Sequence, residues 1–399
     1  MHVLWTITLS ADTKPIKYPG SGCSRSVKFI RENLTTSVVL PLFVTTLGKG
    51  RFELTRGVQH FTPIPTQWVG PLKITGDVID DDNVMVPMAT YESPLWPSTA
   101  RGARVSQMCG GIKCTLVDER MARSVALRAK DGAAANKTWQ SISARRDELE
   151  AVVKTTSRFT KLVGLNKQIV GNLLYLRFEC TTGDASGHNM VTKAADALLS
   201  WLLQEYPEMD YSTISGNFCT DKKTSAVNGI LGRGKNVIAE IEIPRNVCSR
   251  MLRTTPEKMV QLNVEKNLIG GNIAGSLRSA NAHFANMLLA FYLATGQDAA
   301  NIIEGSQGIV HCEAREDSLY FSTTLPNLIV GSTGSGKGNE TAEQHLKALG
   351  CREEREPGEN GRRLAAICAA TVLCGELSLM AAQTNPGELM RTHILMERI

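Results

Sequence analysis

The clearest helical pattern in the chain lies at residues 188–206, HNMVTKAADALLSWLLQEY, where apolar side chains recur three and four positions apart. This spacing predicts an amphipathic helix. Just before it, residues 126–183 contain a helical run, DELEAVVKTTSRF, followed by an apolar run, NLLYLRFECT, that predicts a strand or a β-hairpin. Together these elements could close as a small independent unit.

Outside this unit, the N-terminal part of the chain shows a different pattern. Residues 1–70 are rich in β-branched residues, Gly and Pro, which predicts strands and loops. From Pro94 to Arg128 the pattern is helical after a start marked by proline. The N-terminal part is therefore predicted to begin with strands and to continue into a helix.

The C-terminal half contains both helical and strand patterns. A strand is predicted at 236–243 and a long helix at 279–295, and SLYFSTTLPNLIVG predicts a strand pair that ends in a glycine-rich loop. The charged segment CREEREPGENGRR predicts an exposed linker into an apolar helix at 364–382. The longest apolar run, 364–374, is shorter than the roughly 20 residues of a membrane span, so a buried helix is predicted.

Length and composition narrow the class of protein. A chain of 399 residues with 42% hydrophobic residues can bury a full core and is expected to form two or three domains. The net charge of +5 comes from scattered residues and lacks the block of like charge that marks a nucleic-acid arm, although it suits an anionic small ligand. Ten cysteines without a CxxC pair predict reduced thiols, a cytoplasmic location and no metal site.

A glycine-rich turn, GSTGSGKGN at 331–339, follows an apolar strand and nearly matches the P-loop pattern GxxxxGK[ST]. Gly338 stands where a P-loop has the hydroxyl that binds magnesium, which argues against a nucleotide hydrolase. The backbone N–H groups of the turn could still contact a phosphate of another ligand. A hydrolase and a plain tight turn remain alternatives for this motif.

A second turn, TTGDASGHN at 181–189, lies between a predicted strand and a predicted helix. A pyrophosphate could rest at the N-terminus of that helix. The turn lacks the Rossmann fingerprint GxGxxG, and its residues would equally form an ordinary helix N-cap. Both interpretations stay open on the residues alone.

Six further residues could carry chemistry. Asp221, Lys222 and the lysine after them lie in SGNFCTDKKTSAVNGILGRGK, where adjacent lysines either form a solvated face or line a pocket for a carbonyl and a carboxylate. Glu92 precedes a predicted helix and would ordinarily complement its dipole. Asp298 would ordinarily be an N-cap, and His393 a surface histidine.

These motifs occur in an order that resembles the hydroxymethylglutaryl-CoA reductase family. The resemblance extends from about residue 32 to residue 393, nearly the whole chain. The CTDKK block and the blocks from NLIGGNIAGS to GQDAANIIEGS are too long for chance similarity. The blocks are RENL, VGPLKI, VPMATYES, STARG, VDERMARS, TSRF, GDASGHNM, SGNFCTDKKTSAVNGILGRGK, EKNLIGGNIAGSLRSANAHFAN, ATGQDAANIIEGSQ, LPNLIVGSTGSGKG and MRTHI.

The resemblance implies an oxidoreductase of the mevalonate pathway of isoprenoid biosynthesis. It would reduce (S)-3-hydroxy-3-methylglutaryl-CoA with NADPH to mevalonate and free CoA, through mevaldehyde. The family's catalytic residues fall on Glu92, Lys222, Asp298 and His393. Lys222 would stabilise the charge on the thioester oxygen, and His393 would donate a proton to the CoA sulfur. Glu92 would supply a proton to the alcohol oxygen, and Asp298 would lie between Lys222 and Glu92.

The resemblance also implies the ligand contacts. Arg158 beside a hydroxyl suits a 2′-phosphate, so NADPH is expected in preference to NADH. The cofactor contacts fall on Ser157, Arg158, Asp184, Asn189, Gly334, Ser335 and Gly336. The substrate contacts fall on Arg123, Ser215, Asp221, Lys223, Lys266 and Asn286.

The family's architecture is α+β, with a large mixed helix and sheet substrate domain and an inserted small ferredoxin-like cofactor-binding domain. The large domain would comprise 1–125 and 213–375, the small domain 126–212, and a C-terminal flap 376–399. The expected partners are hydroxymethylglutaryl-CoA and CoA, with no nucleic acid and no membrane. A homodimer or a dimer of dimers with shared active sites is expected. The alternatives are a catalytically impaired member that binds CoA or cofactor and a P-loop-like nucleotide hydrolase.

Overall fold

The computed structural model describes residues 44–47, 50–53, 62–334 and 338–397. The chain divides into two compact units, Met1–Thr62 and Pro63–Ile399. In the first unit, β1 (Val44–Leu47) and β2 (Gly50–Glu53) form an antiparallel hairpin. The RENL block at residues 31–34 lies outside the described residues.

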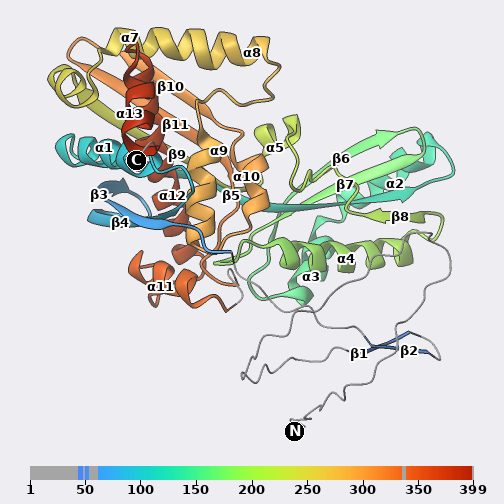
Figure 1. Ribbon diagram of the computed structural model, residues 1–399. Helices are drawn as coiled ribbons and strands as arrows, with labels where there is room; N and C mark the ends of the chain where they lie inside the picture. The colour runs from blue at the N-terminus through green and yellow to red at the C-terminus, as the bar shows by residue number, and fades with distance from the viewer. Residues whose placement is uncertain (1–43, 48–49, 54–61, 335–337, 398–399) are drawn as a thin grey trace, which may run out of the picture. The chain divides into compact units, whose positions relative to one another are not determined.

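The second unit is built on a mixed sheet with the strand order β10-β11-β9-β5-β3-β4 (Figure 1). Its neighbours are antiparallel except for β3 and β5, which are parallel. The strands are β3 (Thr66–Gly76), β4 (Asp81–Ala89), β5 (Ile112–Arg128), β9 (Gly234–Pro244), β10 (Ile309–Ala314) and β11 (Ser318–Leu328). β9 confirms the strand predicted at 236–243.

The long strand β5 belongs to two groups of strands. Its first half pairs with β9, from Lys113 to Arg120, and its second half pairs with β7, from Met121 to Arg128. β7 (Leu173–Cys180) also pairs with β6 (Leu162–Val170), and β8 (Asp210–Ile214) pairs with β5. The helix predicted through residue 128 is therefore wrong beyond α1 (Leu95–Met108). Pairing along both halves of β5 overrides its local pattern.

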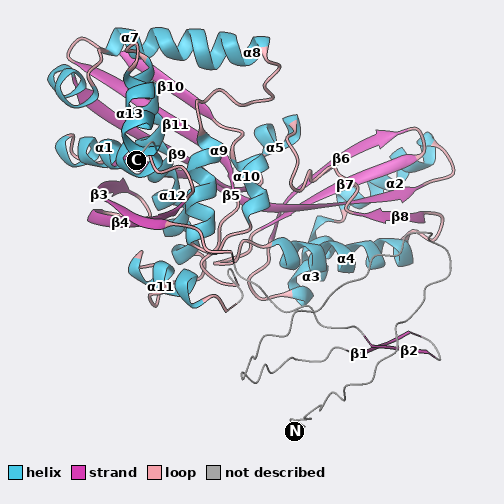
Figure 2. Ribbon diagram, in the orientation of Figure 1, coloured by secondary structure: helices cyan, strands magenta, loops and turns pink. Residues whose placement is uncertain are grey.

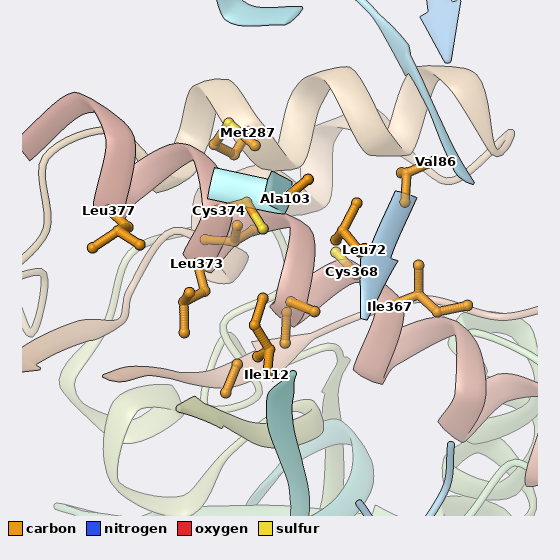
Figure 3. Packing of buried hydrophobic residues seen from close by; sticks show 14 of the residues in the cluster. Leu72, Val86, Ala103, Ile112, Met287, Ile367, Cys368, Leu373, Cys374 and Leu377 are labelled. Atoms are coloured by element: carbon orange, nitrogen blue, oxygen red, sulfur yellow. The ribbon is translucent and has the colours of Figure 1, made fainter. Parts of the chain in front are cut away.

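The first hydrophobic core surrounds α12 (Glu359–Gln383), which packs against α1 and α9 (Phe284–Ala294) (Figure 3). α1 approaches α12 so closely that a Cβ on Gly102 would lie 2.2 Å from the carbonyl oxygen of Cys374. Among the described residues, α12 alone is long and apolar enough to span a membrane, but 94% of its most apolar window is buried. This burial is typical of a core helix. The flap boundary expected at residue 376 falls inside α12.

The second core lies between strands β5 to β8 and the helices that cover them. These helices are α2 (Gly132–Ala144), α3 (Arg146–Thr156) and α4 (His188–Glu205) (Figure 2). Phe178 of β7 and Leu198 of α4 are both buried in this cluster. The amphipathic helix predicted at 188–206 is confirmed. Of the strand or hairpin predicted from NLLYLRFECT, the strand is found: the segment forms β7, which pairs with the preceding β6. The combination of helices and mixed sheet confirms the α+β class.

Two predicted elements differ in extent. The helix predicted to start at 279 begins at Phe284, because Glu376 of α12 accepts hydrogen bonds from the backbone N–H groups of Ala282 and His283. The predicted strand pair at 318–331 is the single strand β11, which lies between β9 and β10 and has an irregular register between Leu325 and Leu328.

The remaining elements are short helices and two peripheral helices, α11 and α13. They are α5 (Ala226–Leu231), α6 (Arg245–Val247), η1 (Cys248–Leu252), α7 (Pro256–Leu262), η2 (Asn263–Gly270), α8 (Gly271–Ile273), η3 (Ala299–Asn301), α10 (Ile302–Gly305), α11 (Glu340–Ala348) and α13 (Glu388–Glu397).

Candidate active site

The loop between β8 and α5 carries the Asp-Lys-Lys run and has an unusual backbone. Four non-glycine residues adopt positive φ: Ser215 at 65°, Asn217 at 57°, Thr220 at 44° and Lys222 at 56°. A left-handed conformation costs such residues about 1–3 kcal/mol each and persists only where the surroundings enforce it. Residues with such strained backbones cluster at functional sites, which marks this loop as a candidate.

A buried charge network holds the loop in place. Glu304 of α10 accepts hydrogen bonds from the backbone N–H of Lys222 at 3.0 Å and from Arg233 at 2.8 Å. Arg233 also approaches Asp221, with 3.0 Å between Nη2 and Oδ1. The side chains of Arg233 and Glu304 are both fully buried. Leaving a buried charge unpaired costs a large free energy, so each of these two charges needs its partner. The contact with Glu304 thereby fixes the backbone at Lys222.

Lys222 and Asp298 form an ion pair beside this network. The Lys222 Nζ lies 2.7 Å from Asp298 Oδ2. The exposed fraction is 41% for the Lys222 side chain and 42% for the Asp298 side chain. The hydrogen bond to Asp298 raises the pKa of Lys222 above its ordinary value. Burial alone would raise the pKa of Asp298, but the hydrogen bonds from Lys222 and Ala300 outweigh it and lower that pKa. Both groups are thus charged at neutral pH.

Asp298 also has the structural role expected from its position after a helix. Its carboxylate accepts a hydrogen bond from the Ala300 N–H at 3.2 Å and caps η3. Capping leaves the second carboxylate oxygen to Lys222. A single side chain therefore anchors a helix start and holds the ammonium group.

The two turns predicted to contact phosphates lie side by side. The Thr333 N–H donates to the Asp184 carbonyl at 3.2 Å, and Ala185 forms a parallel bridge with Thr333. A Cβ on Gly331 would lie 2.2 Å from the Ser186 nitrogen, so this approach requires glycine. The two turns, which are about 150 residues apart in the sequence, form one surface.

A cleft of about 640 Å³ opens between these turns, the start of α4 and the Lys222–Asp298 pair. Gly187 at the N-cap of α4 has a φ of 94° and provides no side-chain cap. The first turn of α4 lines the cleft, and its N–H groups and dipole favour an anionic ligand. The lining residues are Arg123, Ala185, Ser186, Gly187, His188, Asn189, Met190, Asp221, Lys222, Gly296, Gln297, Asp298, Thr333 and Gly334.

Four of the predicted substrate contacts gather around the strained loop. Arg123 of β5 donates to the Ser215 Oγ at 3.3 Å and lies 3.6 Å from a carboxylate oxygen of Asp221. The exposed Lys223 donates to the Asp221 carbonyl at 3.0 Å. This side of the cleft therefore carries a cluster of cationic groups suited to an anionic substrate.

Glu92 and Asn286 are placed together but apart from the cleft. Asn286 of α9 donates to a carboxylate oxygen of Glu92 at 2.7 Å. Among the described residues of one chain, no hydrogen bond or ion pair joins Glu92 to Lys222 or Asp298. Within a single chain, Asp298 therefore pairs with Lys222, and Glu92 pairs with Asn286.

Lys266 and His393 are also absent from the described residues that line the cleft. Lys266 lies in η2, and His393 lies in α13, which contacts α12. An ion pair of 2.9 Å between Glu388 and Arg101 ties α13 to α1. One chain therefore divides the predicted catalytic residues, with Lys222 and Asp298 in the cleft and Glu92 and His393 elsewhere.

The predicted cofactor contacts are also divided. Asn189 and Gly334 line the cleft, whereas Ser335 and Gly336 lie outside the described residues. Asp184 instead accepts hydrogen bonds from the N–H groups of Gly358 at 3.0 Å and Gly361 at 2.8 Å, at the start of α12.

The TSRF motif begins at Thr156, the last residue of α3, and does not line the cleft. Ser157 Oγ accepts a hydrogen bond from the Phe159 N–H at 3.2 Å. The Arg158 guanidinium lies over the Phe159 ring, 4.5 Å from its centre. Arg158 is exposed, and this ring contact is with its neighbour in the motif.

Comparison with known proteins decides the family. Residues 58–398 match the family described as hydroxymethylglutaryl-coenzyme A reductase. The chain is 42% identical over 338 residues to the 3-hydroxy-3-methylglutaryl-coenzyme A reductase of Pyrococcus horikoshii, which covers 84% of this chain and 81% of that protein. It is 37% identical over 387 residues to reductase 1 of Dictyostelium discoideum, which covers 94% of this chain and 69% of that protein. The chain belongs to the hydroxymethylglutaryl-CoA reductase family.

Solved structures share the reductase fold. A class II reductase from Streptococcus pneumoniae, described as bound to NADPH in open conformations, gives a TM-score of 0.65 at 18% identity and covers 83% of this chain and 88% of that chain. A second structure from the same organism gives 0.65 at 19% identity and covers 84% and 77%. The resemblance inferred from the motif order is thereby confirmed.

Three residues of this reductase site had no role assigned from the sequence: His188, Arg233 and Glu304. All three lie inside the blocks GDASGHNM, LGRGK and IIEGSQ that carry the family resemblance. Their spacing along the chain gives no sign of a network, because Arg233 and Glu304 are 71 positions apart. An arginine and a glutamate in otherwise apolar, glycine-rich segments are the available signal.

Proposed function

We propose that the chain reduces (S)-3-hydroxy-3-methylglutaryl-CoA to mevalonate and CoA with NADPH, through mevaldehyde, in the mevalonate pathway. The observation that carries the proposal is the Lys222–Asp298 pair, held by a strained loop at the edge of a cleft that two glycine-containing turns form. The reaction itself is proposed from membership of the reductase family, and the geometry of the cleft is compatible with it.

The residues of the cleft suit a dinucleotide. When bound, NADPH supplies the hydrides for both reduction steps. The uncapped start of α4 and the backbone around Gly334 would hold its phosphates, with Asn189 beside them. The Asp184 carboxylate, occupied by the start of α12, would position this turn rather than contact the cofactor. We retain Ser157 and Arg158 as the proposed contacts of the 2′-phosphate.

Lys222 provides the electrostatic part of the mechanism. Reduction of a thioester places negative charge on the carbonyl oxygen, and an ammonium group directed at that oxygen stabilises it. Asp298 keeps Lys222 protonated and oriented. Arg123 and Lys223, with Ser215, would hold the carboxylate of the acyl group. The chemistry therefore needs a second set of groups that deliver protons.

Glu92 and His393 are the proposed proton donors, to the alcohol oxygen and to the CoA sulfur. Neither lines the cleft of one chain. This separation supports the proposal that the active unit is a homodimer or a dimer of dimers, in which another subunit completes each site. Asn286, paired with Glu92, and Lys266 would contact substrate from that side.

We also propose that the domain division follows the two cores. The core of β5 to β8 with α2 to α4 supports a small cofactor domain at about 126–212, and the core around α12 supports the large substrate domain. The nine cysteines in the described residues are free, which supports a reducing cytoplasmic location.

The test is to follow NADPH absorbance, and separately NADH absorbance, when hydroxymethylglutaryl-CoA is added to the purified oligomer. A pair of NADPH molecules should be oxidised for each CoA released. Lys222→Gln removes the charge and leaves a polar side chain that is one atom shorter, and it should lower kcat by about 10²–10³-fold. Lys137→Gln, at an exposed lysine of α2, is the control and should leave kcat unchanged.

Two results would point elsewhere. Tight binding of NADPH by a folded oligomer without turnover would favour the impaired binding protein. Magnesium-dependent release of phosphate from a nucleoside triphosphate would favour the hydrolase. Oxidation of neither cofactor would overturn the proposed function.

A further inference from the structure

His188 is a histidine of the cleft that the mechanism above does not use. It is the first residue of α4 and lines the cleft together with Lys222 and Asp298. Its Nδ1 lies 3.4 Å from Ser186 Oγ, and its Nε2 lies 3.8 Å from Asp221 Oδ1. Nε2 is buried and has no hydrogen-bond partner within bonding distance. The ring is thus held between Ser186 and a carboxylate.

The charges around His188 come from several elements. Arg233 at the start of β9 and Arg123 of β5 both lie close to Asp221, which faces the ring. Lys222 and Asp298 complete the set of charged groups that act on it. Burial, and then the charge of Arg233, lower the pKa of His188 to about 4 against the attraction of the two carboxylates. In this arrangement the ring is neutral at pH 7.

The position of Asp221 selects one tautomer of the neutral ring. A proton on Nε2 would point at the Asp221 carboxylate, which can only accept hydrogen bonds. Nδ1 would then be an acceptor that receives a hydrogen bond from Ser186. A phosphate oxygen of a ligand is also an acceptor, so it cannot pair with Nδ1 unless that nitrogen gains a proton.

We propose that His188 takes up a proton when a phosphate group of a dinucleotide enters the cleft. The imidazolium then forms an ion pair with Asp221 on its Nε2 side and donates from Nδ1 to the phosphate, so that it lies between two anionic groups. Ligand binding and proton binding are thereby coupled through one side chain. This inference rests on the proposed function, because it takes the cleft to hold the phosphates of NADPH.

The size of the coupling follows from the charges. An opposite charge within about 4–6 Å raises a histidine pKa by roughly 1–3. Starting from a pKa of about 4, the bound complex should reach about 5 to 7. Proton uptake should therefore be a fraction of one proton per site at pH 7 and should increase toward pH 6.

The experiment is isothermal titration calorimetry of the full-length oligomer with NADP⁺ at pH 7 and pH 6. Each titration is repeated in two buffers with different ionisation enthalpies, so that the difference in heat gives the protons taken up. NAD⁺ serves as a second ligand that has no 2′-phosphate with its own titration. His188→Gln keeps a polar side chain that does not titrate, and His311→Gln is the matched control at an exposed histidine of β10.

Wild type and His311→Gln should take up protons on binding, more at pH 6 than at pH 7, and His188→Gln should lose that uptake. If His188→Gln fails to bind either nucleotide, the wild-type Kd for NAD⁺ tests the inference instead. This Kd should decrease several-fold between pH 7.5 and pH 5.5. Binding with equal proton uptake in both variants, or a wild-type Kd independent of pH, overturns the inference and leaves the proposed function standing. Failure of the wild type to bind either nucleotide overturns both.

Discussion

Replacing Glu304 with glutamine tests whether the buried network supports the strained loop. The substitution keeps size and shape but removes the negative charge that faces Arg233 at 2.8 Å. Both side chains are fully buried, so Arg233 would retain only Asp221, at 3.0 Å, as a charged partner. Water cannot compensate the lost charge there.

The magnitude follows from this burial. Removing one partner of a buried ion pair costs about 3–5 kcal/mol, and the remaining contact to Asp221 places Glu304→Gln near 3 kcal/mol. For a domain of 150–250 residues this corresponds to a melting temperature lower by roughly 6–12 °C. The backbone N–H of Lys222 also loses its charged acceptor. We expect kcat to fall as well, because the ammonium is no longer held in place.

The assay is differential scanning calorimetry of the oligomer, with steady-state turnover measured below the transition. Glu150→Gln is the matched control, since Glu150 pairs with Arg146 at 2.7 Å but both side chains are nearly half exposed. Such a surface pair contributes less than about 1 kcal/mol. If Glu304→Gln melts within a degree of Glu150→Gln, the buried network does not support the fold and the reasoning is refuted.

Three other predictions separate chemistry from stability. Asp298→Asn should retain the cap of η3 and change the free energy of unfolding by less than about 1 kcal/mol. It should lower kcat roughly 100-fold, because Lys222 is misplaced. An unchanged kcat would contradict this prediction. Gly331→Ala would place a Cβ 2.2 Å from the Ser186 nitrogen, so fluorescence titration should show weaker NADPH binding, and an unchanged Kd would show that the turns can separate freely. Because the pKa of His188 is lowered to about 4, the unfolded chain binds the proton first, so up to about 3 kcal/mol of stability should be lost as pH falls from 6.5 to 4. His188→Gln should flatten this part of the stability profile, and identical profiles would argue against the lowered pKa.

The sequence predicted best those elements whose pattern reflects a single local environment. α4 packs one face on the β5 to β8 group, so its apolar spacing is regular. β5 was missed because its two halves pair with different strands and its burial does not alternate regularly. The start of α9 was misplaced because a glutamate nearly a hundred residues away binds the preceding backbone. Long-range contacts of this kind leave no periodic signal.

For the site, the chemical types were predictable and their partners were not. Motif order indicated that Lys222 and Asp298 belong to one site, but no spacing shows that they approach to 2.7 Å. Asp184 also has partners that its position in the sequence does not reveal. It lies in a phosphate-type turn, yet its carboxylate binds backbone N–H groups at the start of α12, which are 174 and 177 positions away.

The charged groups of this site form one buried pair and one exposed pair. This difference explains how the loop can have a strained backbone and still hold its side chains in a defined position. Glu304 and Arg233, fully buried, fix the backbone that carries Lys222, since their electrostatic interactions are strong and unscreened. Lys222 and Asp298 remain substantially exposed, so their side chains are accessible to a ligand. A substitution in the first pair should therefore act on folding and turnover together, whereas one in the second should act on turnover alone. Calorimetry and kinetics on the same variants measure these two effects separately.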